Sequence, residues 1–138
     1  MRMNYFLLIL SLLVLSCKKE PTSVDNTQAI TLTGKWQWIR SSGGIGGGII
    51  VPPISTVVIQ TYTSEGVFSQ SRNDTLLMTS HYGVIKQKTI YSIDSLDVVV
   101  YQDSTITKQV ILYLSTDTLS VGDNMYDGYE SVYRRISQ

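Results

Sequence analysis

Residues 96–121 decide the fold, and they read LDVVVYQDSTITKQVILYLSTDTLSV. Valine, isoleucine, threonine and tyrosine dominate this stretch, and clusters of Asp, Ser and Thr interrupt it twice. β-Branched and aromatic side chains suit the pleated, half-buried surface of a strand, whereas Asp and Ser favour turns. The stretch therefore predicts three consecutive strands, over 96–102, 105–114 and 117–121.

Alternation within 105–114 predicts which side chains face the core. Successive side chains of a strand point to opposite faces of the sheet, so residues of one parity share a face. The residues expected to face the core are Ile106, Val110, Leu112 and Leu114. The residues expected to face water are Thr105, Thr107 and Gln109.

The same composition extends in both directions from this stretch. Further strands are predicted near 35–41, 55–62, 66–72, 76–80, 84–91 and 128–136, and from residue 32 onward no stretch keeps an apolar period of about 3.6 residues. Turn-type clusters leave only two or three residues between several strands, as antiparallel hairpins require. The sequence predicts an all-β domain, an antiparallel up-and-down meander of eight or nine strands, which closure into a barrel would free of exposed edges.

The N-terminal segment predicts export. Residues 5–15 form an apolar run of 11 residues, shorter than the ~20 that a membrane-spanning helix needs but suited to a signal peptide. Residues 14–17, Val-Leu-Ser-Cys, resemble the lipobox of bacterial lipoproteins, although Leu15 is bulkier than the usual residue at that place. This resemblance implies cleavage before Cys17 and attachment of acyl chains such as palmitate to that residue. Several acyl chains together make a durable membrane anchor.

The expected domain organisation follows from these features. Residues 1–16 are the predicted lipoprotein signal peptide, 17–31 the lipidated cysteine with a polar, flexible stalk, and 32–138 the barrel domain. Cleavage would leave 122 of 138 residues, enough for one modest core. The 11 basic and 11 acidic residues balance, which gives no electrostatic reason to expect a nucleic-acid partner. Because Cys17 is the only cysteine, a disulfide or a Cys-based zinc site within the domain is excluded.

Residues for catalysis or metal binding are few. His81 is the only histidine, so a Ser-His-Asp or Cys-His site is not expected. The carboxylate pairs Asp94/Asp97 and Asp123/Asp127 lie in turn-like contexts, and the second misses the alternate spacing of a calcium loop. We therefore expect no enzyme, no cofactor and no metal.

The glycine-rich run at 43–48 is a second feature to interpret. It lacks the Gly-Lys-Ser/Thr ending of a phosphate-binding loop, and no helical pattern follows it. The run is interpreted as a flexible connection between the first two predicted strands. A lid over the open end of a barrel is a further hypothesis for this segment.

Motifs at the two ends of the domain resemble those of a known family. Gly34-Lys35-Trp36 in the first strand resembles the Gly-x-Trp motif of lipocalins and related calycins, in which the tryptophan plugs one end of the barrel and a late arginine packs across it. Arg134 and Arg135 in the last strand supply that arginine. With the glycine-rich run, the chain resembles lipocalin-like lipoproteins of Bacteroidetes. The resemblance implies an antiparallel, up-and-down lipocalin-like barrel of about eight strands, with Gly34, Trp36, Arg134 and Arg135 in the structural motif at one barrel end.

Two functions remain open at this level. The first is a lipoprotein, anchored through Cys17 in the cell envelope on the outer membrane, whose barrel binds a small apolar or amphipathic ligand. The aromatic residues expected to line the site are Trp38, Tyr62, Phe68, Tyr101 and Tyr113. The alternative is a filled barrel that acts as an interaction module, an inhibitor or an envelope-complex subunit, with an unidentified protein partner. A continuous internal cavity would favour the first and an exposed apolar patch the second.

Overall fold

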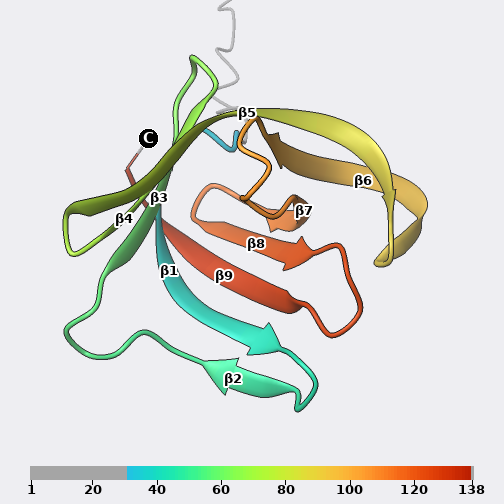
Figure 1. Ribbon diagram of the computed structural model, residues 1–138, viewed down its shortest axis with the longest axis horizontal. Coiled ribbons are helices and arrows are strands. Elements are labelled where there is room, and N and C mark those ends of the chain that lie inside the picture. The colour runs from blue at the N-terminus through green and yellow to red at the C-terminus, as the bar shows by residue number, and fades with distance from the viewer. Residues whose placement is uncertain (1–30, 138) are drawn as a thin grey trace, which may run out of the picture.

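A computed structural model describes residues 31–137, which form nine strands and contain no helix (Figure 1). The strands are β1 (Gly34–Gly43), β2 (Gly48–Ile50), β3 (Val58–Tyr62), β4 (Val67–Arg72), β5 (Thr75–Thr89), β6 (Ser92–Tyr101), β7 (Gln109–Leu114), β8 (Thr118–Asp123) and β9 (Tyr129–Ser137). The predicted signal segment and Cys17 lie outside the described residues.

Eight of the strands close into a barrel. All neighbours pair antiparallel in the order β1, β3, β4, β5, β6, β7, β8, β9, and β9 pairs back onto β1 over most of its length. The ninth strand, β2, pairs only with the end of β1, from Ser41 to Gly43. It lies along the same edge of β1 as β3, which pairs with the start of β1. The prediction of an all-β, antiparallel up-and-down barrel of about eight strands is confirmed.

The region between β3 and β6 differs from the predicted strands. Two strands were expected at 76–80 and 84–91, but β5 runs unbroken through both. Gly83 does not interrupt it, because this residue pairs with Val100 of β6 within a continuous ladder. Asn73 and Asp74 both have positive φ, +48° and +63°, and they connect β4 to β5 in the two-residue hairpin geometry that Asn and Asp tolerate.

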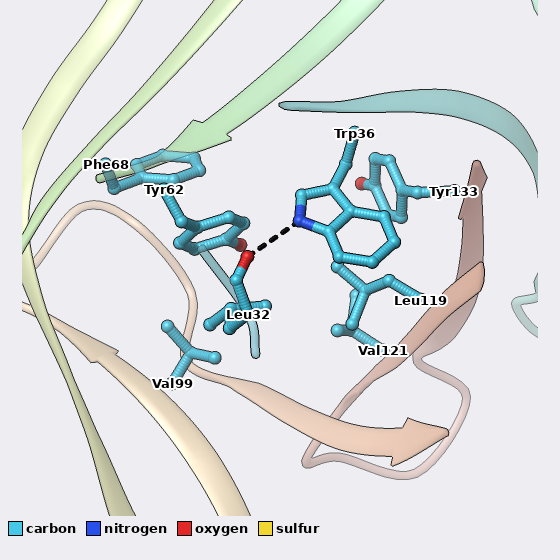
Figure 2. Packing of buried hydrophobic residues seen from close by; sticks show 8 residues of the cluster. All are labelled: Leu32, Trp36, Tyr62, Phe68, Val99, Leu119, Val121 and Tyr133. Atoms are coloured by element: carbon cyan, nitrogen blue, oxygen red, sulfur yellow. Dashed lines mark hydrogen bonds between the residues drawn. The ribbon is translucent and has the colours of Figure 1, made fainter. Parts of the chain in front are cut away.

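The core occupies the inside of the barrel (Figure 2). Its buried members come from several strands and from the segment before β1: Leu32, Trp36, Tyr62, Phe68, Val99, Leu119, Val121 and Tyr133. Leu119 and Val121 share a parity in β8, as the sequence predicts, and Tyr133 faces the same interior from β9. Aromatic rings supply half of this core, which lets a small domain without a disulfide bury a large apolar area.

The predicted facing is wrong for three residues of β7, namely Gln109, Val110 and Leu112. A register shift between Ile111 and Tyr113 breaks the alternation, and Ile111 packs against the core instead of Leu112. Val110 pairs with Val98 on the face opposite to Val99, so it is fully buried on the outside of the barrel, while Gln109 pairs with Val99 on the inner face. A β-bulge reverses the facing of the residues beyond it. A prediction that assumes one regular alternation along the strand therefore misses it.

The tip of the β5–β6 hairpin covers that outer face. Tyr91 donates a hydrogen bond from its hydroxyl to the carbonyl of Asp123 at 2.9 Å, and the amide of Ile90 donates to the side chain of Asn124 at 3.0 Å. Gly122 lies across from Val110, and a Cβ there would be 2.5 Å from the Tyr91 oxygen. The hairpin thus curls beside the end of β8, as Figure 1 shows, and the glycine makes room for it.

Candidate functional site

Trp36 marks one end of the barrel. Its side chain is fully buried, and the indole N–H donates to the carbonyl of Leu32 at 2.8 Å (Figure 2). The guanidinium carbon of Arg135 lies 4.0 Å from the centre of the indole ring, within the range of a cation–π contact. Gly34 begins β1 with φ +135°, a conformation that favours glycine. The predicted packing of a late arginine across the tryptophan is present.

Arg135 also ties three chain segments together. Its Nε, Nη1 and Nη2 atoms donate to the carbonyls of Thr116, Thr33 and Thr31, each at 2.6 Å. Partial burial lowers the pKa of Arg135, but a guanidinium stays charged in proteins. Arg134 was predicted as part of the same motif, but it is exposed, because adjacent residues of a strand face opposite sides. The Trp36 end is therefore closed by structural contacts.

A cluster of uncharged polar side chains lies inside the barrel. The hydroxyls of Tyr62 (β3) and Tyr101 (β6) are 3.1 Å apart, and Tyr101 donates to Oε1 of Gln109 (β7) at 2.9 Å. Tyr62 also lies within 3.3 Å of Oε1 of Gln60, whose amide nitrogen donates to Gln70 of β4 at 3.1 Å. We call these five residues the interior polar cluster: Gln60, Tyr62, Gln70, Tyr101 and Gln109.

Aromatic rings flank this cluster. The Tyr62 ring centre lies 5.1 Å from that of Phe68 and 5.1 Å from that of Tyr82, and Phe68 lies 4.8 Å from Tyr101. Burial is the main cause that raises the pKa of Tyr62 and of Tyr101, so both phenols stay neutral at physiological pH. Three of the five predicted lining residues, Tyr62, Phe68 and Tyr101, therefore meet at one site.

The other two predicted lining residues lie elsewhere. Trp38 packs against the core and donates from its indole nitrogen to the Ser41 hydroxyl at 3.0 Å. Tyr113 pairs with Ser120, which lies between the inward-facing Leu119 and Val121, so Tyr113 is on the outer face and 58% exposed. Its expected inward orientation is wrong, because the register shift in β7 turns it outward.

The three glutamines were missed by the sequence analysis. Gln109 was expected to face water, and no role was expected for Gln60 or Gln70. One signal was present: Gln60 precedes Tyr62 by two residues, which places both on one face of the predicted strand. The pairing of Gln60 with Gln70, and of Gln109 with Val99, depends on strand register, which the sequence alone does not supply.

Two aspartates that were considered for catalysis make other contacts. Asp123 pairs with Gln109 in the ladder, and its Oδ2 accepts a hydrogen bond from the Tyr129 amide at 3.1 Å. Asp97 forms an ion pair with Lys86 at 3.0 Å. Among residues 31–137, no three His, Cys, Asp or Glu side chains gather in a way that suits a metal ion.

Two hollows on the surface lie near these strands. One of about 380 Å³ is lined by Val67, Thr79, Ser80, His81, Gln102 and Asp103, and the other, of about 230 Å³, lies along 33–35 and 61–65. Tyr62 alone of the interior polar cluster contributes to either hollow. His81 is exposed in the first hollow, away from the cluster.

Comparison with other proteins adds nothing to this geometry: no family model, no curated protein and no solved structure matches the chain. Within the described part of the chain, none of the secondary structure is a helix of the length and apolarity needed to cross a bilayer.

Proposed function

We propose that this protein is a lipid-anchored barrel of the cell envelope that binds a small amphipathic molecule at the interior polar cluster. The observation that carries the proposal is the partial exposure of Gln70, Tyr101 and Gln109. These polar groups lie inside a closed barrel near the buried rings of Phe68 and Tyr62, yet each of the three residues is partly exposed. A few convergent polar groups next to apolar and aromatic side chains are typical of small-molecule sites.

Native mass spectrometry tests this function. The chain from residue 18 onward keeps every strand pairing described above, since all of them join residues between Gly34 and Ser137. This form is mixed with an organic extract of the native envelope, purified and sprayed under native conditions. A stoichiometric bound small mass, lost in the Gln109→Leu variant, is the expected result. A bare domain from the same extract contradicts the proposal.

The anchor rests on the lipobox-like sequence before Cys17. Growth with an alkyne analogue of palmitate should label the wild-type chain and leave a Cys17→Ala variant unlabelled. Labelled protein should then fractionate with the outer membrane. Labelling that persists in the variant contradicts attachment at this cysteine.

An interaction module is the second candidate, and exposed isoleucines favour it. Ile45, Ile49 and Ile54 are 95%, 68% and 108% exposed in the connection between β1 and β3. Contiguous exposed apolar side chains often mark interaction surfaces. If the chain cross-links in intact cells to one protein through this segment, and an Ile49→Ser, Ile54→Ser variant does not, the module is favoured over ligand binding.

A further inference from the structure

The interior polar cluster has a chemistry that restricts its ligand. It consists of two phenol hydroxyls and three carboxamides, all of them neutral. Within residues 31–137 the carboxamide nitrogens of Gln70 and Gln109 donate no hydrogen bond, and no fully buried side-chain nitrogen or oxygen lacks a partner. These NH₂ groups are therefore solvent-accessible donors, available to an acceptor oxygen on a ligand.

Within residues 31–137, no Lys or Arg side chain forms a hydrogen bond or an ion pair with the cluster that could balance an anionic ligand. Arg135 donates to three carbonyls at the Trp36 end, and Lys86 is paired with Asp97. Arg72 lies two positions beyond Gln70 on β4, and Lys108 directly precedes Gln109, but both of these residues are exposed. The charged residue next to the cluster in the ladder is Asp123, opposite Gln109, and a carboxylate supplies no counter-charge to an anion.

A cationic ligand is disfavoured for a different reason. The Asp123 carboxylate already accepts the Tyr129 amide, and the cluster itself contributes no negative charge. A charge that leaves water without a full counter-charge costs much more free energy than a neutral polar group does. Neutral hydroxyl and carbonyl groups, in contrast, exchange hydrogen bonds with phenols and carboxamides at little net cost.

We propose that the interior polar cluster selects an uncharged head group with a hydroxyl or carbonyl oxygen, and that it rejects carboxylate and ammonium head groups. This inference rests on the proposed function, since it names the class of ligand that the same site binds. The head group accepts hydrogen bonds from Gln109 and Gln70, and the apolar remainder of the ligand packs beside Tyr101, which is partly exposed.

Three probes with the same chain length separate the head groups. Isothermal titration calorimetry measures binding of 1-decanoylglycerol, decanoate and decyltrimethylammonium to the chain from residue 18 onward, each below its micelle concentration. The neutral probe should bind at least about tenfold more tightly than either ion, a ratio that corresponds to ~1.4 kcal/mol. If an ion binds as tightly as the neutral probe, the inference is wrong, although ligand binding itself stands. If none of the three binds, both the inference and the proposed function fail.

Two variants and a control test whether the interior polar cluster causes the selectivity for the neutral head group. Tyr101→Phe and Gln109→Leu each remove hydrogen-bonding groups of the cluster, and each should weaken binding of 1-decanoylglycerol by about fivefold or more. Tyr113→Phe removes a hydroxyl from the outer face and should leave binding unchanged. Both cluster variants must show native circular dichroism at the assay temperature. Folded variants that bind the neutral probe as the wild type does would assign the cluster to barrel stability alone and overturn the inference.

Discussion

Arg134 and Arg135 are neighbours in β9 with opposite surroundings, which makes them a matched pair for mutation. The Arg135 guanidinium contacts Trp36 and donates to three carbonyls, whereas Arg134 is exposed. Arg135→Lys keeps the charge but loses the planar fork, so we expect the free energy of unfolding to fall by about 1–3 kcal/mol. Arg134→Lys should change it by less than about 0.5 kcal/mol. Urea denaturation measures both, and equal losses would contradict the role of Arg135.

The buried tyrosines predict a loss of stability at alkaline pH. Burial is the main cause that raises the pKa of Tyr62, Tyr101 and Tyr133, the last to about 12. The unfolded chain releases these protons from about pH 10, while the folded chain retains them. The free energy of unfolding should therefore be constant below pH 10 with respect to these groups and fall above it, by up to ~1.4 kcal/mol per pH unit for each tyrosine.

Urea denaturation between pH 8 and pH 11.5 checks this slope. Tyr133→Phe removes one of the three titrating groups and should make the alkaline decline shallower, even if it lowers stability at pH 8. An identical slope in the variant would show that Tyr133 ionises equally in both states.

Contacts of single residues were predictable where a sequence motif includes positions far apart in the chain. Trp36 and a C-terminal arginine were expected to meet, and Arg135 does lie over the indole. The glutamines of the interior polar cluster escaped prediction because a polar residue in an alternating strand is expected to face water. Gln60 and Gln109 face inward, where their hydrogen bonds to Tyr62 and Tyr101 offset the loss of solvent.

At the level of elements, the contact between the β5–β6 hairpin and β8 depends on a glycine. A Cβ at Gly122 would lie 2.5 Å from the Tyr91 hydroxyl oxygen and 3.0 Å from Cδ1 of Leu112. Gly122→Ala should displace the hairpin tip and lower the free energy of unfolding by about 1–3 kcal/mol. Gly46→Ala is the control, because nothing lies within 4 Å of a Cβ there and its φ is not in the left-handed region.

Hydrogen exchange separates displacement of the hairpin from general destabilisation. In Gly122→Ala, amides of 87–93 should exchange faster, while those of β9 keep their protection relative to the global stability. A double variant with Tyr91→Ala removes the obstructing ring and should restore part of the loss. Unchanged exchange at the hairpin tip would contradict this contact.

Strand positions were more predictable than strand boundaries and facing. Composition located every barrel strand, yet it split β5 in two and missed β2, a strand of three residues. Gly83 lies between the two predicted strands, and its pairing with Val100 keeps the ladder intact. The facing of β7 was wrong because its register shift depends on pairing with β8, which is a tertiary property.

For the whole molecule, closure depends on the last strand. β9 pairs with β8 along one edge and with β1 along the other, so its removal would leave two exposed edges and uncover Leu119 and Trp36. Every pairing except β1–β9 and β1–β3 joins strands that are consecutive in the sequence. The β1–β9 pairing spans almost the whole domain and therefore carries the largest loop-closure cost.

Two truncations test whether closure and folding are one event. A chain that ends at Gly128 lacks β9 entirely, and we expect it to lose cooperative unfolding and the dispersed amide resonances of a unique fold. A chain that ends at Ile136 loses only the Ser137–Lys35 pair and should retain both, with a decrease in stability of at most about 1 kcal/mol. Retention of cooperative unfolding after the larger truncation would mean that β1 to β8 are stable as an open sheet. The Trp36–Arg135 contact would then stabilise a core that folds without β9, and it would not be required for that core to form.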